Sequence, residues 1–274
     1  MTLSIPKSEL EGVKRANEIG RQPVVFLNSL WLLPSSWDRW MERFEEAGYT
    51  ALGPGWPDDS THDTIGQIAD HYERIVSKLY LKPALVGHSF GGLLTEMLAG
   101  RGLSTASVAI SPAPFRGVLP LSFSALKSAW PAVNDPANRN RAVPLTFDEF
   151  RYAFANTVSE HEAKELYESF AVPAPPRPII QASNANLNPW TEAQVRQNPD
   201  RGPMLVIAGE FDHSVPLAAA QASFEIERLD PDNLTEYWVM RERGHSLTID
   251  HGWSEVADVA LRFVERHAPA AVRG

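Results

Sequence analysis

The chain has 274 residues, with 34 acidic and 25 basic side chains and a formal net charge of −9. That length is enough to bury a substantial core, and α/β folds of this size are often a single unit. The negative charge and the lack of any basic run argue against a nucleic-acid partner. Because the chain has no cysteine, a disulfide, a thiolate metal site and a cysteine nucleophile are all excluded. No metal-ligand spacing is visible, so we expect neither a metal nor a cofactor.

The amino-terminal segment is charged rather than apolar. Its first twenty residues hold six charged side chains and no apolar h-region, so we expect no signal peptide. No apolar stretch approaches the length of a membrane span. The sequence therefore predicts a cytoplasmic protein that acts on a small molecule and not on a membrane, and it leaves the oligomeric state open.

Helical and extended patterns alternate in the first part of the chain. Residues 7–19 have charged and small side chains at roughly helical spacing, and 23–27 is an apolar strand. A helix capped by Ser35 or Ser36 is expected next, because apolar side chains recur there at three- and four-residue intervals, namely Trp37, Trp40, Met41 and Phe44. A short strand at 49–52 and a helix from about 65 to 79 follow. This rhythm is typical of an α/β fold.

The most informative motif is Gly87-His88-Ser89-Phe90-Gly91-Gly92, which lies between an apolar strand at 84–86 and a helical pattern at 93–99. A serine on such a strand-to-helix turn is pushed outward with its hydroxyl exposed, and the glycines two residues before and after it leave the backbone unobstructed. Gly92 adds a second small residue, which lets helix and strand approach. The motif predicts that Ser89 is a nucleophile.

A nucleophilic serine needs a base and an acid that orients the base, and two later strands each end in a suitable residue. An apolar strand at 202–209 is followed by Asp212, and a strand at 235–240 is followed by His245, before a helix at about 253–267. In a parallel sheet the carboxyl ends of these strands lie at one edge, where ligands bind in open α/β folds. Ser89, Asp212 and His245 are therefore expected to lie close together.

With this order of serine, aspartate and histidine, the chain resembles the α/β-hydrolase family from about Pro23 to Val264, in its serine esterase and lipase branch with a helical lid. The resemblance implies an α/β fold with a mostly parallel central sheet flanked by helices. It implies further that Ser89 is the nucleophile, Asp212 the acid and His245 the base. In some relatives the acid follows the preceding strand, but here that strand, at 107–110, ends in Ser111-Pro112.

Other roles for these residues stay open on the sequence. Ser89 could be a small residue in a tight turn, and Asp212 could cap the helix that begins near 216. His251 and His213 are rivals for the base, although His251 reads as a solvated surface histidine and His213 either lines the pocket or is exposed. His88 is expected to pack beneath the turn with its ring hydrogen-bonded.

Two backbone N–H groups should receive the negative charge that develops on the substrate oxygen. One belongs to Phe90, the residue after the nucleophile, and by position in the family the other belongs to Leu30. The pair Asn28-Ser29 stands where the family usually has His-Gly, and a side chain at Ser29 restricts backbone angles that glycine allows. Asn28 can hydrogen-bond across the loop in place of the imidazole, and Ser29 can add a hydroxyl to the pocket floor.

Residues 113–199 interrupt the rhythm with proline-rich turns and helical segments, and in the family an insertion here forms the lid. We therefore expect a hydrolase core at 1–112 and 200–274 and a helical cap at 113–199, with a capping box at Ser159 and Glu162 opening one of its helices. Aromatic side chains that could contact substrate are Trp31 and Trp56, on loops at the catalytic edge, and Phe150 and Phe154 in the cap.

These observations predict a serine hydrolase for a small, largely apolar ester, amide, thioester or lactone, acting through an acyl-enzyme. Two other functions stay open. One is a cofactor-free lyase, cyclase or oxygenase that uses the same residues for proton transfer, which the substitution of Asn28-Ser29 keeps in consideration. The other is a ligand-binding sensor on a hydrolase scaffold.

Overall fold

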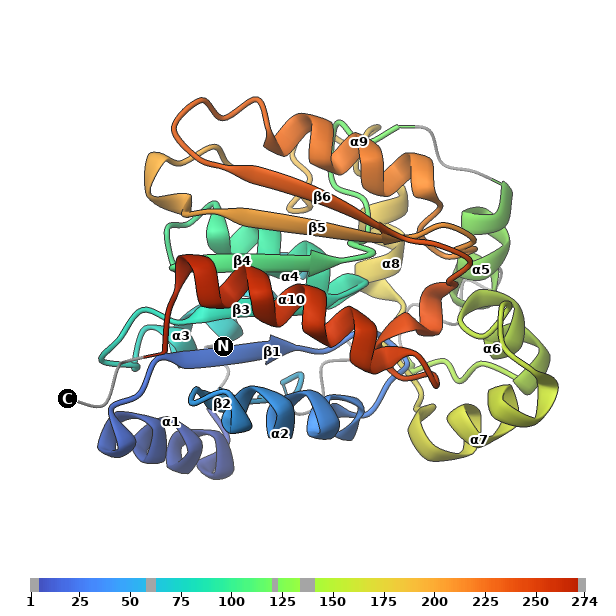
Figure 1. Ribbon diagram of the computed structural model, residues 1–274. Coiled ribbons are helices and arrows are strands. Elements are labelled where there is room, and N and C mark those ends of the chain that lie inside the picture. Colours follow the sequence, from blue (N-terminus) through green and yellow to red (C-terminus); the bar gives the residue numbers. More distant parts are fainter. Residues whose placement is uncertain (1–4, 58–62, 120–122, 134–140, 271–274) are drawn as a thin grey trace.

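The computed structural model describes residues 5–57, 63–119, 123–133 and 141–270 (Figure 1). A single six-stranded sheet runs through it in the order β2-β1-β3-β4-β5-β6, and every neighbouring pair is parallel. The strands are β1 (Pro23–Leu27), β2 (Thr50–Leu52), β3 (Ala84–His88), β4 (Ala106–Ile110), β5 (Met204–Gly209) and β6 (Thr235–Met240). The expected α/β fold with a parallel central sheet is confirmed.

Helices cover both faces of this sheet. The core is flanked by α1 (Lys7–Ile19), α2 (Asp38–Glu46), α3 (Ile65–Val76), α4 (Phe90–Ala99), α9 (Leu217–Glu227) and α10 (Trp253–His267). Figure 1 shows α2 and α10 in front of the strands, with α3 and α4 behind them. Side chains of β1 alternate accordingly, because Val24 and Phe26 pack in the core cluster of α2 and α10, whereas Val25 and Leu27 pack in that of α3 and α4.

The aromatic stripe expected after β1 forms the packing face of α2. Phe26 lies 5.2 Å from Trp37 and 5.3 Å from Phe44, measured between ring centroids, and both partners are buried. Burial of each such ring stabilises the fold by roughly 2–3 kcal/mol. The expected cap is wrong, because a 3₁₀ turn at Pro34–Trp37 precedes α2 and neither Ser35 nor Ser36 caps it with its side chain.

Other helix ends follow local sequence signals. A capping box at Thr64 and Gln67 opens α3, which ends at Val76 and not at 79 as expected. At α7 only half of the expected box forms. Ser159 accepts from the Glu162 N–H, whereas the Glu162 carboxylate accepts from the N–H of His251 instead. The more distant partner replaces the local one because α7 lies beside the loop that precedes α10.

The connection from β4 to β5 contains the remaining helices, α5 (Phe123–Val133), α6 (Phe147–Ala153), α7 (Glu160–Phe170) and α8 (Arg177–Ser183). Figure 1 shows α5, α6 and α7 beyond the carboxyl ends of the strands. Two isolated antiparallel bridges, Leu32 with Ala171 and Val143 with Ala174, join this connection to the loop after β1 and to itself. The connection therefore lies at the sheet edge where Ser89 and His245 were expected.

A buried charged cluster fixes the point where the chain returns to the sheet. Arg201 is fully buried, and its guanidinium lies 3.2 Å from the Glu227 carboxylate and 3.6 Å from that of Asp230. Next to it, Ser223 of α9 donates a hydrogen bond to Glu96 of α4. Burial raises the pKa of Glu96 well above its ordinary value, and burial raises the pKa of Glu227 to about 7 against the opposing charge of Arg201. Polar contacts therefore tie α9 to the helix that follows Ser89.

Candidate active site

Ser89 lies on a sharp turn between β3 and α4. Its backbone has φ 56° and ψ −114°, a conformation that costs a non-glycine residue about 1–3 kcal/mol. Two backbone hydrogen bonds hold it there, since Ser89 N–H donates to Ile110 O at 2.9 Å and Ala113 N–H donates to Ser89 O at 2.9 Å. The surrounding strands therefore impose the strained turn that the sequence motif predicts.

Close approach, and not positive φ, explains the two glycines that flank Ser89. A Cβ on Gly87 would lie 2.1 Å from Gly91 O, and a Cβ on Gly91 would lie 2.0 Å from Leu27 O. Neither residue has a positive φ; Ser89 does. The strand and helix can therefore meet at this angle only where both positions lack a side chain.

His245 and Asp212 form a buried hydrogen-bonded pair. His245 Nδ1 lies 2.7 Å from Asp212 Oδ2, and the two residues are 0% and 4% exposed. The other carboxylate oxygen, Oδ1, accepts from the backbone N–H groups of Ser214 and Val215, each at 2.8 Å. Because Asp212 accepts from Nδ1–H, the lone pair of the imidazole is on Nε2. That nitrogen is buried and has no hydrogen-bond partner within the described residues.

His88 lies beneath His245, with the two ring centroids 4.6 Å apart. It is buried, and its Nδ1 lies 3.4 Å from Thr248 Oγ1. Burial lowers the pKa of His88 well below its ordinary value, and the neighbouring His245 lowers it further. His88 is therefore neutral near pH 7 and adds no positive charge under His245.

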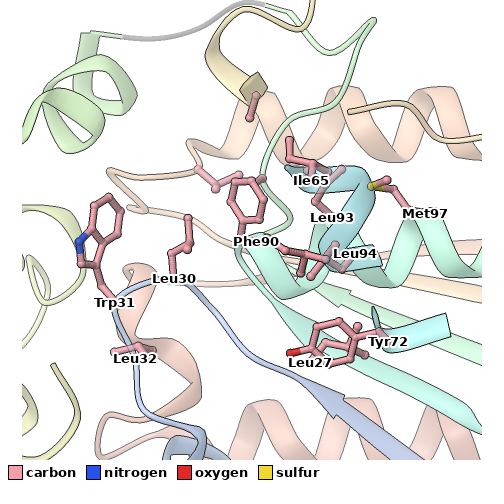
Figure 2. Close-up of a cluster of buried hydrophobic side chains, with 14 of the residues drawn as sticks. Leu27, Leu30, Trp31, Leu32, Ile65, Tyr72, Phe90, Leu93, Leu94 and Met97 are labelled. Carbon is pink, nitrogen blue, oxygen red and sulfur yellow. The ribbon is translucent and has the colours of Figure 1, made fainter. Parts of the chain in front are cut away.

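A cavity of about 100 Å³ opens on the same side of the sheet as Ser89 and His245. Six of the residues singled out in the sequence line it, namely Leu30, Trp31, Ser89, Phe90, Phe154 and His245. Asp212 lies behind His245, and the ring of Phe154 packs edge-on against His245 at 4.9 Å. The loop after β1, the turn after β3 and the segment between β4 and β5 thus meet around one small hollow. Figure 2 shows Leu30, Trp31 and Phe90 among the buried hydrophobic side chains of this part of the core.

Leu30 and Phe90, the two residues whose N–H groups were expected to receive the oxyanion, both line this cavity. Phe90 is the first residue of α4, so its N–H has no acceptor inside the helix. Leu30 N–H donates to no backbone carbonyl within the described residues. Ser29, next to it, is not among the residues with positive φ, whereas Trp31 is, with φ 63°. The strained residue of this loop is therefore Trp31, and the side chain of Ser29 does not obstruct the path of the loop.

Residues 24–259 match the family model described as the alpha/beta hydrolase family. The chain belongs to this family. Among solved structures it is similar to an extracellular alpha/beta-hydrolase from a Paenibacillus species, with 19% identity, a TM-score of 0.65, and coverage of 88% of this chain and 98% of that one. It is also similar to the monoacylglycerol lipase of Paleococcus ferrophilus, with 18% identity, a TM-score of 0.64, and coverage of 90% and 95%. At these identities the likeness shows the fold alone. No curated protein matches the chain.

Four other predicted substrate contacts of this α/β-hydrolase lie outside the lining of the small cavity. Phe150 is buried and stacked on Phe154 at 5.1 Å between ring centroids, and it does not line the cavity. Asn28, Ser29 and Trp56 line a separate and larger groove, and Trp56 Nε1–H donates to Asn28 O at 3.3 Å. The side-chain amide of Asn28 is buried with no hydrogen-bond partner for either atom within the described residues.

The residues of α5 and α8 that line the cavity were not predicted from the sequence. They are Ala125, Ser128 and Ala129 on one helix, and Ile179, Ala182 and Ser183 on the other. Both sets have the i, i+3, i+4 spacing of a single helical face, so the signal was present. It was not recognised because neither helix was predicted, and prolines interrupt or open both.

The rival histidines have other partners. His251 has a side chain 72% exposed and pairs with Glu162, and His213 Nδ1 lies 3.0 Å from Tyr152 O. In the described parts of the chain, no three acidic or histidine side chains are arranged to hold a metal ion. No described helix is long and apolar enough to cross a membrane.

Proposed function

We propose that this α/β-hydrolase is a serine hydrolase that cleaves a small, largely apolar ester, amide, thioester or lactone through an acyl-enzyme. One observation carries the proposal. His245 is held by Asp212 at 2.7 Å with its Nε2 unpartnered, and its ring lines the same cavity as Ser89 on its strained turn. An oriented imidazole with a free lone pair, in the same cavity as a half-buried serine hydroxyl, meets the requirement for nucleophilic acyl transfer.

The reaction runs in two halves. Ser89 Oγ attacks the carbonyl carbon while His245 Nε2 takes the hydroxyl proton, and the Asp212 carboxylate stabilises the resulting imidazolium. Collapse of the tetrahedral intermediate breaks the bond to the leaving group, which takes the proton back from Nε2. Water then attacks the acyl-enzyme with His245 as base, so the acid is released and Ser89 is regenerated.

The oxyanion is received by the N–H groups of Phe90 and Leu30. Each such donor contributes about 3–4 kcal/mol of transition-state stabilisation. The neutral state of His88 supports this scheme, because a second cation 4.6 Å below would oppose the formation of the imidazolium on His245.

The size and lining of the cavity support a small, apolar reacting group. About 100 Å³ is available, and the walls include Leu30, Phe90 and Phe154. An ester substrate is further favoured by similar structures that are named a monoacylglycerol lipase and a methylesterase. We also propose that residues 113–199 act as the cap, because Phe154 within them packs on His245 and would exclude water from the reaction. A cytoplasmic location stays a prediction from the sequence.

The test is labelling with a fluorophosphonate probe, read by intact mass and peptide mapping, with Ser89→Ala as the control. A single adduct on Ser89 that the variant lacks, together with turnover of short esters, is expected. A folded protein that takes no adduct and hydrolyses no ester would refute the proposal and favour the proton-transfer or ligand-binding functions.

A further inference from the structure

Two hollows lie back to back across the loop that follows β1. The catalytic cavity has about 100 Å³, and the groove on the other side of the loop has about 880 Å³. They share two lining residues within the described chain, Leu30 and Trp31. Behind these, Trp56 of the groove and Phe90 of the cavity approach to 6.0 Å between ring centroids. A wall one or two side chains thick therefore separates a small reaction chamber from a much larger space.

Two hydrogen bonds hold Trp31, one of the residues of this wall, in place. Its Nε1–H donates to Val143 O at 2.8 Å, and its carbonyl accepts from Val172 N–H at 3.0 Å. Both partners belong to the segment between β4 and β5. The side chain is only 9% exposed, and the backbone has φ 63°, which disfavours a bulky residue. A strained, anchored indole is expected to stay in place rather than swing aside.

The groove suits an uncharged chain. Apolar walls come from Met41, Leu52, Trp56 and Val172, and the acidic side chains of Glu9, Asp38, Glu42 and Glu45 outnumber the single basic one, Arg15. Arg15 is moreover paired with Glu45 at 3.3 Å. An anionic tail would meet net negative charge there, whereas a neutral alkyl chain would meet apolar surface.

We propose that Trp31 limits the length of the acyl chain, by closing the catalytic cavity against the groove, and that its removal lets a long neutral acyl chain extend into the groove. This inference rests on the proposed hydrolase function, because it concerns the specificity of that reaction. It makes Trp31 a specificity-determining residue and the groove a latent site for an alkyl chain.

The experiment compares Trp31→Gly with Trp31→Phe. Glycine removes the indole and accepts the positive φ at no cost, whereas phenylalanine keeps a ring in the wall but loses the bond to Val143 O. For each protein, kcat/KM is measured on p-nitrophenyl acetate, butyrate and octanoate. The unaltered protein is expected to prefer the short esters. In Trp31→Gly the octanoate-to-acetate ratio of kcat/KM should rise about tenfold or more, since one methylene accommodated in an apolar pocket changes kcat/KM by about 10- to 200-fold. In Trp31→Phe it should stay close to the original ratio.

A second readout separates this inference from the proposed function. Calorimetric binding of ethanol and n-octanol is compared in Ser89→Ala, with and without Trp31→Gly, and octanol affinity should rise only with the Trp31 change. An unchanged ester ratio with turnover intact, or an equal rise in Trp31→Phe, would overturn the role of Trp31 and leave the hydrolase function standing. If the protein showed neither ester turnover nor fluorophosphonate labelling, but octanol affinity still rose with Trp31→Gly, the hydrolase function would be refuted and the role of Trp31 would stand. If Trp31→Gly does not fold, Trp31→Ala is judged by the same outcomes.

Discussion

The hydrogen bonds of Asp212 predict what replacing it with asparagine would do. Its Oδ1 accepts from two backbone N–H groups, those of Ser214 and Val215, both at 2.8 Å. In Asp212→Asn the amide oxygen must take that place, because an NH₂ group would face two donors. The amide NH₂ then points at His245 Nδ1, which lies 2.7 Å from Oδ2 in the native protein. The imidazole can accept this bond only in the tautomer with its proton on Nε2, where it cannot act as a base toward Ser89.

The expected loss in kcat is about 10⁴-fold, which corresponds to about 5 kcal/mol of transition-state stabilisation. Thermal stability should change little, because the side chain keeps its shape and its backbone partners. The assay is turnover of a short ester together with the rate of fluorophosphonate labelling at Ser89, and both should fall in parallel.

A matched control is Glu210→Gln, two residues away on the same loop. Its carboxylate accepts from Glu242 N–H at 2.9 Å and lines neither hollow. Its activity should stay near that of the unaltered protein. If Asp212→Asn kept more than about a tenth of the original kcat, the tautomer argument would be refuted and the acid would have to be sought elsewhere.

Three further changes test the packing, the buried charges and the oxyanion loop. Gly91→Ala should destabilise the fold by about 1–3 kcal/mol, seen as a lower melting temperature, or prevent folding, since its Cβ would lie 2.0 Å from a backbone oxygen. Gly12→Ala in α1, whose Cβ would have its nearest contact at 3.9 Å, should instead stabilise the fold by about 0.5–1 kcal/mol in thermal melts. Burial raises the pKa of Glu227 from 4.5 to about 7, so the folded state binds this proton more tightly than the unfolded state does. The resulting contribution to the free energy of unfolding, at most about 3 kcal/mol, is full below pH 4.5 and is lost as pH rises through 7. Urea unfolding measured across this pH range should show that loss of stability, and Glu227→Gln should make the stability depend less on pH. An unaltered pH dependence in Glu227→Gln would show that another group titrates. Asn28→His with Ser29→Gly should raise kcat on simple esters if the loop is only detuned, and no gain in a folded protein would count against that explanation.

The sequence sufficed for the parts of the site that depend on local chemistry. The turn at Ser89 was predictable because a side chain at either flanking glycine would clash with the backbone. The strand ends that carry Asp212 and His245 were predictable because buried parallel strands are short apolar runs. The prediction that these three residues lie near one cavity follows from the parallel order of the sheet.

The walls of the cavity were less predictable. Helix α5 contains Pro131, and α8 has a proline in its first turn, so the proline-rich composition of residues 113–199 favoured irregular structure for both. Proline was tolerated in the first turn of α8 because no amide there needs an acceptor. In the loop after β1 the missing glycine at Ser29 indicated a restricted backbone at that position. The positive φ instead lies two residues later, at Trp31. Only tertiary contacts, such as the bond from Trp31 Nε1–H to Val143 O, explain that choice.

Backbone strain in this protein is gathered at one edge of the sheet. Within the described residues, positive φ occurs at four residues other than glycine, and each follows the carboxyl end of a strand: Trp31 after β1, Ser89 after β3, Ser111 after β4 and Glu242 after β6. Each costs about 1–3 kcal/mol, which the packed sheet and helices must offset. Local propensity would not place a tryptophan or a glutamate in this conformation, so the fold holds these residues against their preference. Trp31 and Ser89 line the cavity, Ser111 lies two residues before the lining residue Ala113, and Glu242 lies three residues before His245. Strain therefore marks the proposed catalytic edge independently of the sequence motif.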